Sequence, residues 1–175
     1  MTKNVGKIFE EDFSNSVESD WFCYRLKDAA QSYNNSENTK FSWDNPFDYI
    51  LFNGSTLYCL ELKSTCQKYM GFQISKDDKS SKMIKWHQIE SLTKASEHKN
   101  VISGFLLNFR LDSNEQITYF FNIKDFNRMM KNINKKSFNI MDAVLNGAIK
   151  VQGVKKRTRY NWDTCCVLEQ YSNKV

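Results

Sequence analysis

Two short segments of the sequence carry residue types that could cleave a phosphodiester bond. Asp48 ends the segment Asn45-Pro46-Phe47-Asp48, and Glu61 and Lys63 follow a short distance along the chain. Adjacent carboxylates raise each other's pKa unless a cation lies between them. Mg²⁺ commonly takes one or two carboxylates together with water and phosphate oxygens. Asp48 and Glu61 could therefore hold such an ion, while the Lys63 ammonium offsets charge that develops on the phosphate.

The two segments are predicted to be the arms of a β-hairpin. Residues 47–52 and 56–62 are rich in aromatic and β-branched side chains, and Asn53-Gly54-Ser55 between them is a strong turn signal. If the last two residues of that turn form the loop, Asp48 lies directly opposite Glu61 on one sheet face. If the first two form it, the acids are offset along the strands. We favour the first register.

A simpler interpretation of Glu61 and Lys63 is that they only make an exposed strand soluble. Against it, the strand around them is apolar on both faces, which predicts a central strand. Acidic groups at the end of a central strand are costly without partners. The apolar surroundings therefore favour a site over a solvated surface.

The chain resembles the RecU-type Holliday-junction resolvases, which belong to the PD-(D/E)XK nuclease superfamily. The resemblance runs in order from about Gly6 to Phe121 and becomes weak in the last third. It rests on the segments Gly6-Lys7-Ile8-Phe9-Glu10, Asn45-Pro46-Phe47-Asp48, Glu61-Leu62-Lys63-Ser64-Thr65, His87-Gln88-Ile89-Glu90-Ser91-Leu92 and Gly104-Phe105-Leu106-Leu107-Asn108-Phe109-Arg110. The family implies a restriction-endonuclease-like fold, a homodimer, and paired nicking of four-way DNA junctions with Mg²⁺ or Mn²⁺.

The resemblance also implies a role for each motif residue. Asp48 and Glu61 would be metal ligands and Lys63 the catalytic lysine. Glu10 would be a further metal ligand and catalytic acid on the first helix, although Glu11 is a rival. Alternatively, Glu10 only interacts favourably with the dipole at the start of that helix.

The resemblance makes Gln88 a further candidate catalytic residue, within a helix predicted over 81–97. Its amide could hydrogen-bond a substrate phosphate or a metal-bound water. The neighbouring His87 is a weaker candidate, because it could simply cap or pack on the helix surface.

The charge of the chain is mildly basic, with 25 Lys and Arg against 20 Asp and Glu, or +5. This favours a polyanionic partner without requiring one. Candidate DNA-binding residues surround the proposed site: Arg25, Lys68, Lys76, Lys79, Lys82 and Lys85. A solvated charged surface is the alternative for each of them. Residues 66–82 correspond to the projecting stalk of the resembled family, although the polar run here is longer.

The 175 residues predict a single α/β domain, with a mixed central sheet of about five strands flanked by helices. Helices are expected over 5–17, 81–97, 123–132 and 141–148. Strands are expected over 21–26, 47–52, 56–62, 101–110 and 116–123. An Asn- and Ser-rich surface loop is expected over 31–42. The tail over 157–168 is predicted either to be a strand or to cross a dimer.

Cysteine usage and hydropathy indicate a cytoplasmic protein, and the resemblance implies that a bacterium or a phage encodes it. The five cysteines include no Cys-x-x-Cys pair, which argues against structural zinc. No signal peptide and no apolar run able to span a membrane is evident.

The function expected is a Mg²⁺-dependent junction-resolving endodeoxyribonuclease. The alternatives are another nuclease of the same superfamily, such as a restriction enzyme or recombination exonuclease, and an inactive DNA-binding module.

Overall fold

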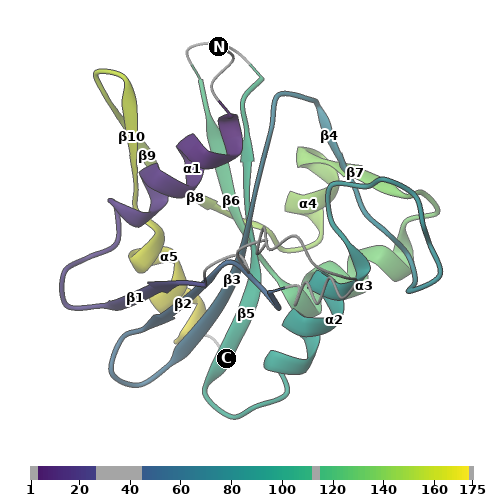
Figure 1. The fold of residues 1–175 in the computed structure, drawn as a ribbon, viewed down its shortest axis with the longest axis horizontal. Helices are drawn as coiled ribbons and strands as arrows, with labels where there is room; N and C mark the ends of the chain where they lie inside the picture. Colours follow the sequence, from purple (N-terminus) through teal and green to yellow (C-terminus); the bar gives the residue numbers. More distant parts are fainter. Residues whose placement is uncertain (1–3, 27–44, 112–114, 174–175) are drawn as a thin grey trace, which may run out of the picture.

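The computed structural model describes residues 4–26, 45–111 and 115–173 (Figure 1). Among the described residues, the longest segment without a helix or strand covers residues 72–85. The helices are α1 (Val5–Ser14), α2 (Trp86–Ala95), α3 (Ile123–Asn132), α4 (Ile140–Leu145) and α5 (Thr164–Ser172). The strands are β1 (Phe22–Arg25), β2 (Tyr49–Phe52), β3 (Leu57–Thr65), β4 (Tyr69–Gly71), β5 (Val101–Phe109), β6 (Ile117–Asn122), β7 (Ser137–Asn139), β8 (Ile149–Val151), β9 (Gly153–Lys156) and β10 (Arg159–Trp162).

A six-stranded mixed sheet with the order β1-β2-β3-β5-β6-β8 forms the centre of the molecule. Only β3 and β5 pair in parallel, while the other neighbours are antiparallel. The α/β class with a mixed sheet is therefore confirmed. The strand beyond the expected five is β8, a short segment that joins the edge of the sheet beside β6.

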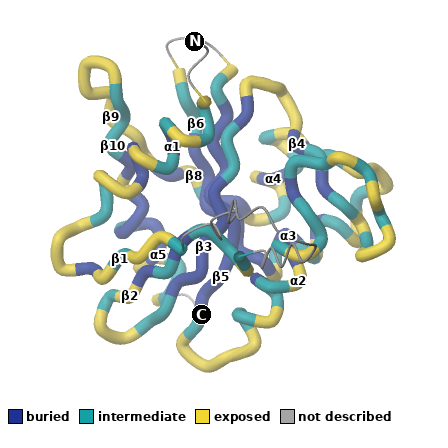
Figure 2. Tube along the Cα trace, in the orientation of Figure 1, coloured by how far each residue is buried: buried dark blue, intermediate teal, exposed yellow. Residues whose placement is uncertain are grey.

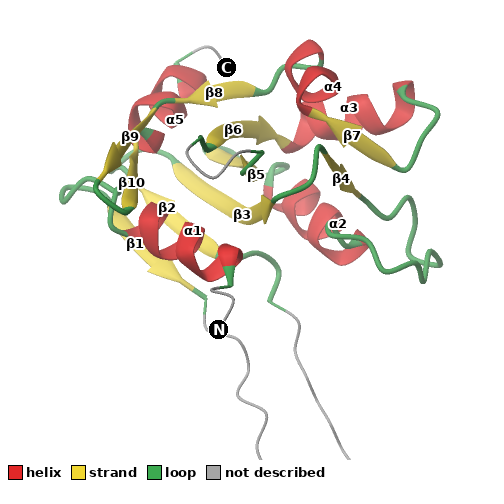
Figure 3. Cartoon of the chain, turned by 90° about the horizontal axis from the view of Figure 1, so that it is seen from above, coloured by secondary structure: helices red, strands yellow, loops and turns green. Residues whose placement is uncertain are grey.

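Helices cover both faces of this sheet (Figure 3). On one face, Phe9 and Phe13 of α1 and Leu168 of α5 pack with Leu60 and Leu106 of the central strands. On the other face, α2, α3 and α4 contribute Ile89, Leu92, Phe126, Met129 and Ala143 to a second cluster. Buried residues concentrate in β3 and β5, and exposed ones follow the rim (Figure 2). Among the described residues, no helix has the length and apolar character to cross a membrane.

The β2–β3 hairpin has the register that the turn sequence favours. Phe52 pairs with Leu57 and Tyr49 with Leu60, so Gly54-Ser55 is the two-residue loop. The Asn53 side chain accepts hydrogen bonds from Ser55 N at 3.1 Å and Thr56 N at 2.9 Å. Gly54 has φ 93°, a conformation that glycine adopts without steric cost. Extending this register by one residue places Asp48 opposite Glu61, as predicted.

The helix predicted over 81–97 begins only at Trp86. Ile84 is held in an extended bridge to Phe72, with Ile84 N donating to Gly71 O at 3.0 Å. Both side chains are fully buried, so packing overrides the helical spacing of the residues that precede Trp86.

The tail contains β10 and α5, and β10 pairs with β9 of the same chain. Of the two interpretations of the tail, the strand is correct for 159–162. The predicted loop over 31–42 and the turn at 112–114 lie outside the described residues.

The segment predicted as a stalk begins inside the body of the protein. β4 pairs with β7, and Met70 is fully buried in the second core cluster. Further along, Asp78 Oδ2 forms an ion pair with Lys136 Nζ at 3.3 Å. Within residues 66–82, both β4 and Asp78 are therefore attached to the body of the protein.

We predict that Gly104→Ala lowers the free energy of unfolding by about 1–3 kcal/mol, because the added methyl would overpack the sheet. A Cβ at Gly104 would lie 2.5 Å from Phe121 O and 3.0 Å from Asn122 Cα, which are backbone atoms that cannot turn aside. Gly6→Ala in α1 is the matched control, since it meets only the Asn4 side chain. Its effect should stay within about 1 kcal/mol of zero, because alanine favours the helix while its methyl would lie 3.3 Å from the Asn4 oxygen that caps α1. Urea unfolding of both variants measures the contrast, and equal values would contradict it.

Candidate active site

The candidate catalytic residues meet where β2 begins and β3 runs past it. Asp48 directly precedes β2, and its Oδ2 accepts a hydrogen bond from Leu62 N at 2.8 Å. This bond ties the Asp48 carboxylate to the neighbouring strand. Because side chains alternate along a strand, Glu61 and Lys63 share one face of β3, while Leu60 and Leu62 enter the opposite core cluster.

Glu61 is the most buried acid of this group, with 2% of its surface exposed. Its Oε1 accepts a hydrogen bond from Lys63 Nζ at 2.7 Å and another from Gln88 Nε2. Burial raises the pKa of Glu61 to about 7, although the Lys63 ammonium opposes this and Asp48 adds to it. A carboxyl held neutral or singly paired near pH 7 is a group whose charge a bound cation would stabilise.

Asp48 has the same electrostatic conflict in weaker form. Burial raises its pKa, and Glu10 raises it further, while the Leu62 N–H, Lys63 and Arg25 lower it. Acids whose pKa values are raised by burial and neighbouring charge cluster at functional sites, which makes this pair a candidate site.

Gln88 has a contact that its sequence position did not predict. Its Oε1 accepts from Lys85 N at 2.9 Å, which caps the start of α2, and its Nε2 donates to Glu61. In the structure, the Gln88 amide therefore orients the Glu61 carboxylate and is not free to bind a phosphate. His87 next to it is exposed.

Glu10 lies near the other acids but is engaged elsewhere. Arg25 Nη2 binds Glu10 Oε2 at 2.9 Å, and the two charges are close enough to influence Asp48. The rival, Glu11, binds Arg159 instead, so Glu10 is the better placed of the two. Within residues 4–26, 45–111 and 115–173, no three His, Cys, Asp or Glu side chains form a group that could hold a metal. The structure thus brings Asp48, Glu61, Lys63 and Gln88 together, with Glu10 paired to Arg25 beside them.

The residues present suit a hard divalent cation, even though the third ligand is not in position. The two opposed acids supply oxygen donors, which Mg²⁺ prefers, and Mg²⁺ usually keeps several waters. Asp48 and Glu61 are the residues that could hold it.

The candidate DNA-binding residues lie at the end of β1, in the turn between β3 and β4, and in the segment between β4 and α2. Arg25 is at the end of β1, in the ion pair with Glu10. Lys68, Lys76 and Lys79 are exposed, whereas Lys82 and Lys85 are half-buried.

A polar network that the sequence interpretation missed lies on the opposite face of β3 and β5. Ser64 Oγ donates to Asn108 Oδ1 at 2.8 Å, and Arg110 Nε donates to the same oxygen at 2.9 Å. Asn108 Nδ2 in turn donates to Thr118 Oγ1 at 2.9 Å. The polar residues at alternate positions in the Gly104–Arg110 strand were the available signal. The network links β3, β5 and β6 directly after Lys63 in the sequence.

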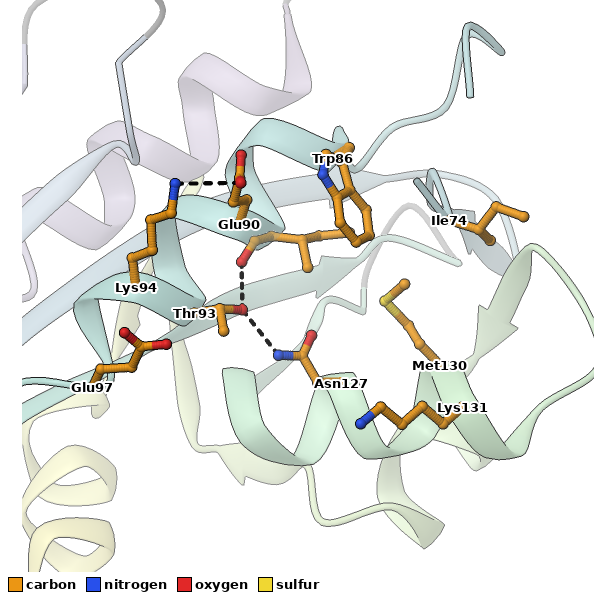
Figure 4. A pocket seen from close by; sticks show the side chains of 10 residues that line it. Ile74, Trp86, Glu90, Thr93, Lys94, Glu97, Asn127, Met130 and Lys131 are labelled. Atoms are coloured by element: carbon orange, nitrogen blue, oxygen red, sulfur yellow. Dashed lines mark hydrogen bonds and ion pairs between the residues drawn. The ribbon is translucent and has the colours of Figure 1, made fainter. Parts of the chain in front are cut away.

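A cavity of about 500 Å³ lies between α2 and α3, away from the carboxylates (Figure 4). Ile74, Trp86 and Met130 line it, and Asn127 Nδ2 donates to Thr93 Oγ1 at 2.9 Å across it. Asp48, Glu61, Lys63 and Gln88 are not among its lining residues. The candidate chemistry is therefore at the end of the sheet and not in this cavity.

Comparison with known proteins gives similarities to a prophage protein and to a solved structure. The SPbeta prophage-derived uncharacterized protein YotM of Bacillus subtilis (strain 168) is 36% identical over 134 residues, which are 76% of this chain and 63% of that protein. The match thus spans less than two thirds of the relative's length. Hjc, a Holliday junction resolvase of Archaeoglobus fulgidus, has a solved structure that superposes with a TM-score of 0.48 at 14% identity. That superposition covers 82% of this chain and 93% of the other. No protein-family model matches the chain. Neither similarity assigns an activity to this chain.

Proposed function

We propose that the protein is a divalent-metal-dependent endodeoxyribonuclease with a PD-(D/E)XK-type site. The observation that carries this proposal is the hairpin register, which sets Asp48 against Glu61 with Lys63 on the same sheet face. Burial raises the pKa of both acids, so the site is electrostatically strained as long as no cation neutralises it. Phosphodiester hydrolysis needs the same set: oxygen ligands for a cation and a fixed positive charge.

Each residue has a separate task in this proposal. Asp48 and Glu61 hold Mg²⁺ or Mn²⁺, which when bound polarises the phosphate and lowers the pKa of water. Lys63 places its ammonium where negative charge develops on the phosphate. Gln88 acts as a positioning residue, because its amide fixes the Glu61 carboxylate. Glu10 contributes as a ligand only if it leaves Arg25, and the ion pair between them is accessible to solvent.

The proposed substrate is branched DNA, in particular the four-way junction. A homodimer would cut it during recombination or repair. The RecU-like motifs support this choice, and two equivalent sites would nick a junction symmetrically. Exposed Lys68, Lys76 and Lys79 supply phosphate contacts, whose strength should fall steeply with salt. We propose a cytoplasmic site of action in a bacterium, with the gene either bacterial or carried by a phage.

A cleavage assay tests the proposal. Synthetic four-way junctions, linear duplex and single strands are incubated with Mg²⁺, Mn²⁺ or EDTA. We expect paired nicks in the junction with either metal and none in EDTA, because removal of the ion leaves Asp48 and Glu61 without a cation. End-dependent degradation of duplex would instead indicate another nuclease of the same superfamily.

A second candidate function is a DNA-binding module without activity. It is favoured by the pairing of Glu10 with Arg25 and by the missing group of three ligands among the described residues. Junction binding in EDTA, combined with no cleavage in either metal, would support this candidate and overturn the first.

A further inference from the structure

Three aromatic side chains are exposed on the sheet next to the candidate site. Phe22, Tyr24 and Phe52 have 58%, 47% and 40% of their surfaces exposed, which is unusual for large apolar residues in strands. Phe22 and Phe52 are register partners on β1 and β2, and Tyr24 is partnered by the half-buried Ile50. We call Phe22, Tyr24 and Phe52 the aromatic platform.

The strand register places the aromatic platform on the same face as the candidate catalytic residues. Tyr24 pairs with Ile50, which pairs with Cys59, and side chains in one such row point the same way. The next row on this face contains Asp48 and Glu61. At a strand rise of roughly 3.3 Å per residue, the Tyr24 row is about 7 Å from the acids and the Phe22 row about 13 Å. Neighbouring nucleotides of one strand could therefore reach both.

The geometry of the rings suits stacking. The Phe22 and Tyr24 rings are nearly parallel, with an interplanar angle of 7° and centroids 6.4 Å apart. Aromatic side chains exposed on a sheet face stack two or three unpaired bases in known single-strand-binding modules. The helices that bury the rest of this face, α2 and α3, pack on β3, β5 and β6 instead.

The size of the platform argues against a second copy of the chain as its partner. A stable protein interface buries roughly 800 Å² on each partner and uses about 20–30 residues a side. Three exposed rings at a sheet edge cover much less than that, yet match the faces of a few bases. Arg25, the next residue on β1 after Tyr24, points to the opposite face of the sheet and binds Glu10 there, so it does not belong to this platform.

We propose that the aromatic platform stacks unpaired bases of the DNA substrate and guides that strand toward Asp48 and Glu61. This rests on the proposed nuclease function and narrows its substrate class to branched DNA with unpaired nucleotides beside the branch, such as a gapped junction or a flap. Fully paired duplex would use the phosphate contacts alone.

Fluorescence anisotropy of a labelled oligothymidylate in EDTA tests the proposal without hydrolysis. Phe22→Leu and Tyr24→Leu should each weaken binding by about 5- to 150-fold, the range for loss of one base–aromatic stack. Affinity for fully paired duplex should change less than twofold. Tyr69→Leu on β4 is the matched control, since Tyr69 is 57% exposed but lies outside the platform, and its affinity should not change. Thermal melting checks that the variants remain folded.

Three results would overturn this inference: no binding of oligothymidylate by the wild type, equal binding by all variants, or loss of a dimer in sedimentation velocity for the platform variants. The last would assign the platform to a second copy of the chain. Failure of the nuclease proposal is separate, because it would appear as no cleavage in Mg²⁺ or Mn²⁺ while the platform variants still weakened single-strand binding.

Discussion

Asp48→Asn and Lys63→Ala are each expected to lower the cleavage rate at least about 100-fold while leaving junction binding in EDTA nearly unchanged. The asparagine keeps a carbonyl oxygen for Leu62 N, so the strand contact at 2.8 Å survives while the charge for the cation is lost. The alanine removes the ammonium that lies 2.7 Å from Glu61. Single-turnover cleavage of a labelled junction measures the first effect, and a gel-shift titration the second.

The controls for these variants are Asp163→Asn and Lys99→Ala, which make the same substitutions at exposed positions. Neither segment carries a proposed site residue or a proposed phosphate contact. Both should cut at the wild-type rate. Lys63→Ala also leaves Glu61 buried without its cationic partner, so its melting temperature is measured beside the kinetics. Lys63→Arg restores the charge and should recover folding even if cleavage stays low. If Asp48→Asn or Lys63→Ala cleaves the junction at the wild-type rate, the assignment of these residues to the active site is wrong.

The second large effect concerns Glu61 and pH. Its pKa is about 7 in the folded protein, against 4.5 for the ordinary group. Between these values the unfolded chain holds fewer protons at this position than the folded chain, so the free energy of unfolding falls as pH rises. The contribution of protonated Glu61 to the free energy of unfolding is complete below pH 4.5, and it is lost as pH rises through 7. The loss from this group alone amounts to about 3 kcal/mol.

Glu61→Gln should remove that loss, because a neutral amide has no proton to release. Its carbonyl oxygen can still accept from Lys63 and Gln88, so the packing around it is retained. Urea unfolding of both proteins in EDTA at several pH values gives the difference in slope, in which other titrating groups cancel. We expect the variant to gain stability over the wild type above pH 7, and to have no cleavage activity. Parallel pH profiles would show that Glu61 is ionised at its ordinary pKa.

Mg²⁺ should reverse the effect in the wild type only. At pH 8, an ion bound by Asp48 and Glu61 would stabilise the charged form and raise the melting temperature. Glu61→Gln loses one of these ligands and should respond much less. Equal shifts in both proteins would place the ion elsewhere.

Short-range chemistry explains what could be predicted for the site. The hairpin register follows from Asn53-Gly54-Ser55, because few residue types form a two-residue loop and the alternation along each arm is fixed. That register alone brings Asp48 opposite Glu61 and puts Lys63 on the same face. The residues involved are close in sequence, so no distant contact can easily change their order.

Contacts between distant segments explain which features of the fold and the site could not be predicted from the sequence. The helix predicted from 81 begins at Trp86 because Phe72 and Ile84 are buried together in an extended bridge. Gln88 donates to Glu61, 27 residues away, only because α2 packs beside β3. Likewise Glu10 and Arg25 are 15 residues apart and meet only because α1 packs on the sheet. No local pattern encodes these distances.

The sequence by itself determined the α/β class, the hairpin and the opposed pair of acids, because strand period and turn chemistry act over a few residues. Tertiary structure decided the electrostatics: it buried Glu61, raised its pKa and gave it Lys63 and Gln88 as partners. It also decided that Phe22, Tyr24 and Phe52 remain exposed on the face that carries Asp48 and Glu61. Burial and exposure depend on which helices cover which strands, and packing of the whole chain sets that arrangement.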